Sequence, residues 1–88
     1  MENKVLVKLL VPEIDEEYDI FLPINKKIGN IIILLNKAIN EMSNNVFIEN
    51  NYSELYNATT GQTYEPNILL NDTNIRNNTK LILISNRA

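Results

Sequence analysis

Two residue types that carry much of protein chemistry are missing from this 88-residue chain, which has neither cysteine nor histidine. Without cysteine the chain can form no disulfide, no zinc–thiolate site and no iron–sulfur cluster. Without histidine it lacks the commonest general base and the commonest metal ligand. Carboxylates, lysines, tyrosines and hydroxyls remain, but no spacing among them suggests a paired-carboxylate or nucleophile–base site. We therefore expect no enzyme activity, no catalytic residue, no metal and no cofactor.

Long apolar runs and a basic surplus are missing as well. No stretch approaches the roughly 18 apolar residues of a membrane-spanning helix, and residues 4–8 alternate like a strand rather than form a signal peptide. The net charge of −3 disfavours nucleic acid and anionic lipid as partners. The acidic residues between Glu13 and Asp19 lack the glycine and the ligand spacing of an EF-hand, so we interpret them as a solvated turn. These absences predict a cytoplasmic protein that neither inserts into a membrane nor binds nucleic acid or small molecules.

The clearest pattern that is present is a helical one between Ile28 and Met42. Apolar residues recur there at spacings of three and four and fall within a stripe of roughly 100° on a helical wheel. We expect this stripe to face the core and Ile33 to be exposed. If the helix begins early, Asn25 is the better residue to cap its start. The members of the stripe are Ile28, Ile31, Ile32, Leu35, Ile39 and Met42.

The segments on either side of the helix are typical of strands, because apolar residues alternate with polar ones. Residues 4–11 and 18–22 are joined by a short acidic connection and predict an antiparallel hairpin. Residues 52–59 and 62–64, joined by a tight turn at Gly61, and residues 80–85 predict three further strands. The core-facing residues expected in the first, second and last of these strands are Val5, Val7, Leu9, Tyr18, Ile20, Leu22, Leu81 and Leu83.

Two connections carry apolar residues whose place is less clear. Residues 46–51 are either a short strand or a loop that tucks apolar side chains under the helix. In the second connection we expect Ile68, Leu69 and Leu70 to anchor the chain to the core. The sequence Asn71-Asp72-Thr73 is suited to capping a helical turn that contains Ile75.

The order of these elements predicts the fold. Two strands, a helix and then two or three strands form an α+β protein of the β-grasp type. A mixed sheet of four to five strands packs on one α-helix, with the first and last strands paired in its centre. We expect one domain over residues 1–88, with a core from about residue 4 to residue 85.

From Tyr18 onward the chain resembles ubiquitin-like domains. Ile20-Phe21-Leu22-Pro23 followed by Ile28 resembles the entry into their helix. Thr60-Gly61-Gln62, then Leu70, Asp72, Ile75 and Leu81-Ile82-Leu83, resemble their C-terminal half. The strand that ends at Pro12 and the isoleucine- and leucine-rich helix look similar to the YukD/EsaB family of Firmicutes. That resemblance implies a cytoplasmic accessory or regulatory protein of a bacterial type VII (ESX-like) secretion system, with protein partners that include membrane-anchored components of the machinery.

Two functions from different classes follow from the resemblance. The first is a non-conjugating protein-interaction module that uses the outer face of its sheet, where an apolar patch marks an interface. The second is a ubiquitin-like modifier or sulfur carrier that acts through its C-terminus. The tail Asn86-Arg87-Ala88 disfavours the second, because that chemistry needs a terminal diglycine. The residues expected in the patch are Leu6, Leu10, Phe21, Ile82 and Ile84, with Leu6 close to Ile82 or Ile84.

Overall fold

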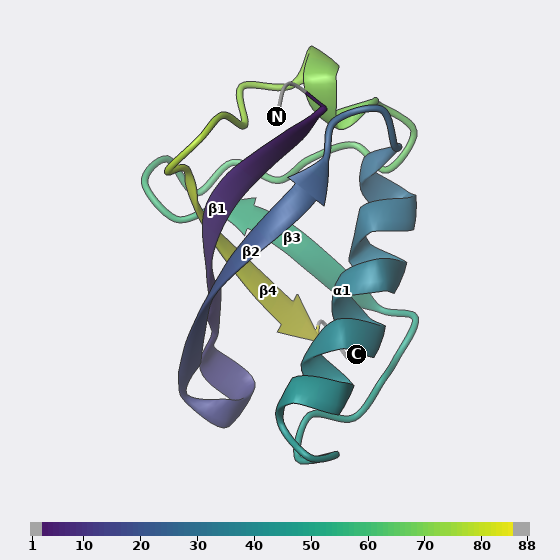
Figure 1. Cartoon of the computed structure of the whole chain (residues 1–88), viewed down its shortest axis with the longest axis vertical. Helices are drawn as coiled ribbons and strands as arrows, with labels where there is room; N and C mark the ends of the chain where they lie inside the picture. The colour runs from purple at the N-terminus through teal and green to yellow at the C-terminus, as the bar shows by residue number, and fades with distance from the viewer. Residues whose placement is uncertain (1–2, 86–88) are drawn as a thin grey trace.

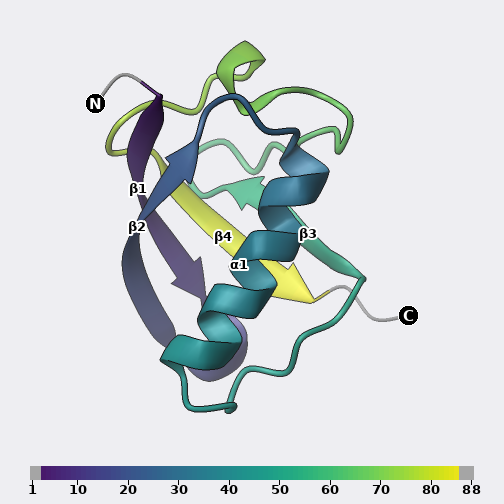
Figure 2. The same cartoon turned by 45° about the vertical axis from the view of Figure 1, so that its right-hand side comes forward.

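A computed structural model describes residues 3–85, which form one mixed sheet with an α-helix laid across it (Figures 1 and 2). The strand order is β2-β1-β4-β3, with β1 antiparallel to β2 and parallel to β4, and β3 antiparallel to β4. This is the β-grasp arrangement, as predicted, and the first and last strands do pair in its centre. The elements are β1 (Lys4–Val11), the 3-10 turn η1 (Pro12–Ile14), β2 (Glu16–Pro23), α1 (Ile28–Met42), β3 (Ser53–Asn57), the 3-10 turn η2 (Leu70–Asp72) and β4 (Lys80–Ser85).

The core forms between the apolar stripe of α1 and the inner face of the sheet. Ile28, Ile31 and Ile39 are fully buried, as are Leu9 and Leu81 on the two central strands. Met42 is an exception to the predicted stripe, because it is 48% exposed. It occupies the last position of the helix, where its side chain lines a hollow that separates the end of α1 from Tyr18 of β2.

The helix does not begin early enough for Asn25 to cap it, and the start of α1 is capped by backbone rather than by a side chain. Lys27 is the N-cap residue and makes no side-chain cap bond. Instead, the amides of Ile28 and Gly29 donate to the carbonyls of Ile68 and Pro66, at 2.9 Å each. These bonds satisfy two of the amides that a helix start leaves without an intrahelical partner. The loop before η2 therefore holds the helix end in place.

Two of the three residues predicted to anchor that loop do not reach the core. Ile68 and Leu69 are 39% and 38% exposed, and only Leu70 is fully buried. The backbone of the first two is used instead, since Ile68 accepts a bond from α1 and Leu69 forms a bridge with Lys27. The predicted cap is wrong as well, because Asn71 and Asp72 lie inside the helical turn, which runs from Leu70 to Asp72, has no side-chain cap and does not contain Ile75.

The strand predicted at residues 62–64 is wrong. Its pairing is reduced to one bridge between Thr63 and Tyr56, so the sheet has four strands. Tyr64 turns inward, and its hydroxyl accepts a bond from Asn57 Nδ2 at 3.1 Å and donates one to Asn74 Oδ1 at 2.7 Å. Pro66 follows and has no amide to donate to a sheet. Together these two residues draw the chain away from β3.

The segment between α1 and β3 is a loop, and it delivers one side chain to the core. Phe47 is fully buried, whereas its neighbours Val46 and Ile48 are 65% and 62% exposed. Of the two alternatives for residues 46–51, the loop that tucks an apolar group under the helix is therefore correct. Within the described residues, no helix has the length and apolar character needed to cross a membrane.

Candidate protein-interaction surface

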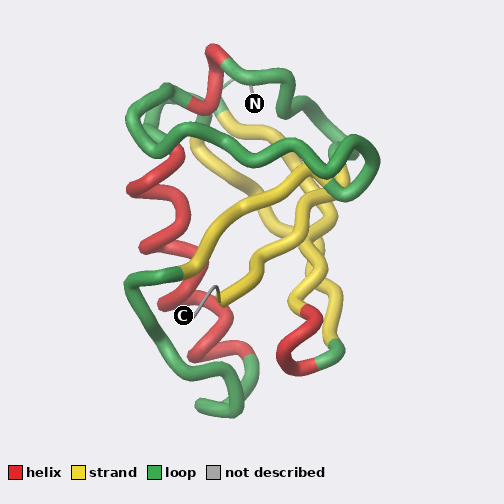
Figure 3. Tube along the Cα trace, turned by 180° about the vertical axis from the view of Figure 1, so that it is seen from behind, coloured by secondary structure: helices red, strands yellow, loops and turns green. Residues whose placement is uncertain are grey.

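The outer face of the sheet, on the side opposite α1, holds the five residues predicted to form an interaction patch. Figure 3 shows the molecule from behind, with β3 and β4 toward the viewer. Phe21 is 63% exposed and Ile84 is 37% exposed. Leu6, Leu10 and Ile82 are half-buried, since each is flanked by neighbours on adjacent strands.

Strand register divides these five residues into two groups. Leu10 lies opposite Ile82, and Ile84 is the next outward residue along β4. Leu6 lies opposite Phe21, at the other end of the hairpin. Leu6 lies four positions along β1 from Leu10, the residue opposite Ile82, which is about 13 Å along the strand direction. The expectation that Leu6 lies close to Ile82 or Ile84 is therefore wrong.

A charged row separates the two groups. Lys8 lies between Asp19 on β2 and Lys80 on β4. Its Nζ is 3.3 Å from Asp19 Oδ1, with the two side chains 42% and 67% exposed. An ion pair this exposed contributes little stability. Its consequence is geometric, because it places polar groups between two apolar surfaces that would otherwise be continuous.

Tyr56 adds an aromatic residue that the sequence-based patch lacked. It lies opposite Ile82 on β4, and its hydroxyl donates to Glu54 Oε1 at 2.8 Å. Leu10, Ile82 and Tyr56 therefore form one row across three strands, with Ile84 beside it. The signal was present in the sequence, since Tyr56 alternates with the core residue Leu55 in a predicted strand. We call the set Leu10, Tyr56, Ile82 and Ile84 the open-face patch.

The open-face patch has the composition of a protein interface. It combines an aromatic ring with branched aliphatic side chains, and charged residues lie at its edge. Glu54 lies beside Ile84 across β3 and β4, and Lys80 lies two residues before Ile82. A centre of this kind with a polar rim suits a partner with its own apolar centre. The arrangement supports binding through contact rather than through chemistry.

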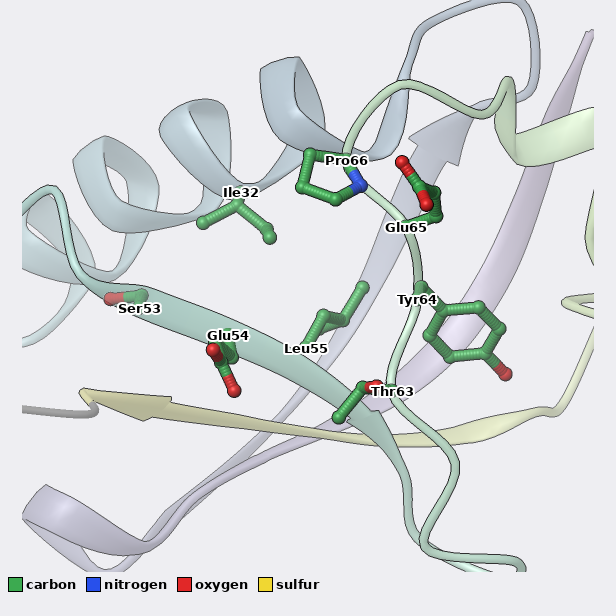
Figure 4. Close-up of a pocket in the computed structure, with 8 residues that line it drawn as sticks. All are labelled: Ile32, Ser53, Glu54, Leu55, Thr63, Tyr64, Glu65 and Pro66. Carbon is green, nitrogen blue, oxygen red and sulfur yellow. The ribbon is translucent and has the colours of Figure 1, made fainter.

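A hollow beside β3 has a volume of about 450 Å³ (Figure 4). Its walls come from β3, from residues 63–66 and from Ile32 on α1. Two carboxylates line it, but Glu54 and Glu65 come from different walls and point in different directions (Figure 4). Because they do not converge, the hollow presents no acid–base pair. Residues 3–85 also hold no cluster of three or more potential metal-ligating side chains.

Comparison with known proteins gives a clear answer for the fold. No protein-family model matches the chain, and no curated protein is similar to it in sequence. The ubiquitin-like domain of EccD5 from Mycobacterium xenopi matches with a TM-score of 0.75 at 17% identity, over 92% of this chain and 92% of that one. The ubiquitin-like domain of the type VII secretion protein EccD1 from Mycobacterium tuberculosis matches with a TM-score of 0.73 at 14% identity, over 93% of this chain and 98% of that one.

A chain of the MycP5-free ESX-5 inner membrane complex is also similar. Its TM-score is 0.68 at 14% identity, and the match covers 98% of this chain and 22% of that one. At identities this low, the structural similarity establishes the ubiquitin-like β-grasp fold and nothing more specific. One fold of this kind serves many functions. The prediction that the chain does not act through a C-terminal diglycine concerns residues 86–88. These residues lie outside the described residues, so it stays a prediction.

Proposed function

We propose that this chain is a non-conjugating ubiquitin-like interaction module that serves a bacterial type VII secretion system from the cytoplasm, as an accessory or regulatory component related to the YukD/EsaB family. Its partner is a protein of that machinery, including its membrane-anchored components, and it performs no catalysis. The observation that carries the proposal is the open-face patch, an apolar row across three strands that no described element covers. The similarity to ubiquitin-like domains of EccD proteins supports the assignment to this type of system.

Site-specific photo-crosslinking in the source cells tests this function. A photoreactive amino acid at Ile84 lies within the open-face patch, and the same amino acid at Ile33 on α1 is the control. Ile33 is 67% exposed, so a photoreactive side chain at this control site is as accessible to a partner protein as one at Ile84. We expect the Ile84 probe to capture a type VII secretion component, identified by mass spectrometry, and the Ile33 probe to capture none. Capture of secretion components at Ile33 alone, or only of unrelated proteins at Ile84, would show the proposal to be wrong.

A double variant, Ile82→Thr with Ile84→Lys, is expected to weaken binding to the captured partner by about 30- to 1,000-fold, since two apolar contacts are each worth roughly 1–2 kcal/mol. Threonine keeps a strand-forming branched side chain at Ile82. Lysine at Ile84 would face Glu54 across the strands, so the sheet should stay intact. Calorimetry measures the affinity, and circular dichroism checks the fold. Unchanged affinity with an intact fold would refute the role of the patch, and Ile33→Lys serves as the matched control.

A further inference from the structure

Two segments that are far apart in the sequence lie side by side at the end of the molecule opposite the tip of the β1–β2 hairpin (Figures 1 and 2). They are the connection between β2 and α1 and the loop that leads into η2. Backbone hydrogen bonds of 2.9 to 3.0 Å join them, so the surface that they form is fixed before any partner arrives. The amide donors and carbonyl acceptors are Asn71 to Ile24, Leu70 to Lys26, Ile28 to Ile68 and Gly29 to Pro66.

Two consecutive apolar residues of the loop stay at this surface. Ile68 and Leu69 are 39% and 38% exposed, although the next residue, Leu70, is fully buried. They cannot turn inward without loss of backbone bonds, because the Ile68 carbonyl accepts the amide of Ile28 and Leu69 forms a bridge with Lys27. Single exposed apolar residues are common on protein surfaces. An adjacent pair on a fixed backbone, however, offers a partner apolar contact with little entropy left to lose.

Two lysines lie beside this apolar pair. Lys27 is directly opposite Leu69 in the bridge, and residues paired in this way direct their side chains to the same side. Lys26 precedes it and is exposed as well. Neither lysine forms an ion pair with any residue between 3 and 85. Both also lie at the positive end of the helix dipole, which disfavours further positive charge. We call Lys26, Lys27, Ile68 and Leu69 the basic–apolar patch.

The carboxylates of the chain do not neutralise the basic–apolar patch. Glu65 and Asp72 belong to the same loop, each three residues from the apolar pair, and neither pairs with the two lysines. The acidic residues from Glu13 to Asp19 lie in the hairpin, at the opposite end of the molecule (Figures 1 and 2). An acidic segment would therefore be repelled at the hairpin and attracted at the patch, and this difference would orient it.

We propose that the basic–apolar patch binds a short segment of a partner protein in which Asp or Glu residues flank a pair of apolar residues. The carboxylates meet Lys26 and Lys27, and the apolar pair packs on Ile68 and Leu69. Side chains carry the recognition, because loop carbonyls already occupy the first amides of α1. The open-face patch lies on the outer side of the sheet, so both surfaces can be occupied at once. This inference does not depend on the assignment to a secretion system.

An anionic membrane and a second copy of the chain are poorer occupants of the same surface. Anionic lipid is recognised by clusters of about four to eight Lys or Arg residues, and the patch has two lysines. A second copy could offer only its acidic hairpin. The apolar residue among those acids, Ile14, packs against the core of its own chain, so the hairpin has no apolar pair to present.

A peptide titration followed by two-dimensional NMR tests the proposal. The probe is the acetylated and amidated peptide Asp-Asp-Leu-Leu-Asp-Asp. Its controls are Lys-Lys-Leu-Leu-Lys-Lys, which reverses the charge, and Asp-Asp-Ser-Ser-Asp-Asp, which removes the apolar pair. We expect the probe to shift resonances of residues 26–29 and 67–70, and each control to bind there at least about fivefold more weakly. Equal binding of the probe and either control at these resonances, shifts confined to the hairpin or the open-face patch, or no shifts would each overturn the proposal.

A matched pair of double variants locates the contact. Lys27→Gln with Leu69→Ser removes one charge and one apolar side chain from the patch. Lys37→Gln with Ile48→Ser removes the same groups at exposed positions outside it. None of the four side chains is buried, so both variants should fold. We expect the first to weaken binding of the probe about tenfold and the second to change it less than about twofold. Equal effects of the two double variants would show that the patch is not the site.

Two further measurements separate the proposed occupant from the other two. Sedimentation with vesicles of phosphatidylglycerol and phosphatidylcholine should leave the protein in solution. Analytical ultracentrifugation should give a monomer. Vesicle binding that the patch double variant abolishes would place a membrane on the surface and overturn the proposal. A dimer that the same variant dissociates would place a second copy there and overturn it as well. A partner for the open-face patch could fail to appear without affecting any of these results.

Discussion

Replacing Phe47 with alanine is expected to lower the free energy of unfolding by about 3–5 kcal/mol, the usual cost of removing a large buried aromatic side chain. Phe47 is fully buried and comes from a loop rather than from a strand or helix. The loop cannot sink to fill the space, because its backbone is held on both sides of the ring. Asn40 Nδ2 donates to the Phe47 carbonyl at 2.7 Å, and the Phe47 amide donates to Ser43 Oγ at 2.9 Å.

A loss of this size is a large share of the stability of a small domain, which is typically about 5–15 kcal/mol in total. Urea unfolding measures the free energy, and calorimetry should show a fall in Tm of roughly 15–30 °C. The neighbours supply the controls, since Val46→Ala and Ile48→Ala remove exposed side chains of the same loop. Each should change the free energy of unfolding by less than about 0.5 kcal/mol. If Phe47→Ala behaved like these controls, the ring would not be part of the core.

The elements that a regular period defines were predicted well. Residues 28–42 form the helix with the bounds that the spacing of its apolar residues indicated. On β1, Val5, Val7 and Leu9 face the core, as strand alternation required. Periodicity works here because each element presents one face to a single core, so burial imposes its repeat directly on the residue order.

The features that were missed depend on contacts between distant segments. Nothing in the residues around Asn25 indicated that carbonyls of Pro66 and Ile68 would cap the helix. Met42 fits the helical stripe, but the wheel does not show that a hollow separates its side chain from β2. The separation of Leu6 from Ile82 follows from the register of β1 against β4, which depends on pairing and not on either strand alone.

The burial of Asn36 is another feature that the helical period could not predict, since the helical wheel gives no reason to bury an amide in the middle of α1. It is 3% exposed. Its Nδ2 donates to the Ile32 carbonyl and to Ser53 Oγ, at 3.1 Å each, and its Oδ1 accepts the Asn50 amide at 2.9 Å. These bonds connect the helix, the loop and the start of β3. Both polar atoms of the buried Asn36 amide are hydrogen-bonded. Replacing Asn36 by an apolar residue would therefore leave its partners without these bonds.

The network extends from Asn36 to the sheet that carries the open-face patch. Asn50 Nδ2 donates to Ser85 Oγ at 2.9 Å, and Ser53 Oγ donates to Asn50 Oδ1 at 2.6 Å. Ser53 and Ser85 lie opposite each other where β3 and β4 pair, and the adjacent pair is Glu54 with Ile84. The amide of Asn36 thus helps to fix the end of the sheet at which Ile84 is presented.

Asn36→Leu is therefore expected to lower the free energy of unfolding by about 2–4 kcal/mol, because the Asn50 amide and the Ser53 hydroxyl lose buried partners. Asn30→Leu is the matched control, since Asn30 is exposed on the same helix and gains the same helix propensity. Urea unfolding compares the two variants, and hydrogen exchange of the Asn50 amide reports on the lost bond directly. Faster exchange at Asn50 in Asn36→Leu, with Asn30→Leu unchanged, would trace the loss to the network. Equal stability of the two variants would show instead that leucine packs at Asn36 without cost, and that the ends of β3 and β4 hold Ile84 without help from the helix.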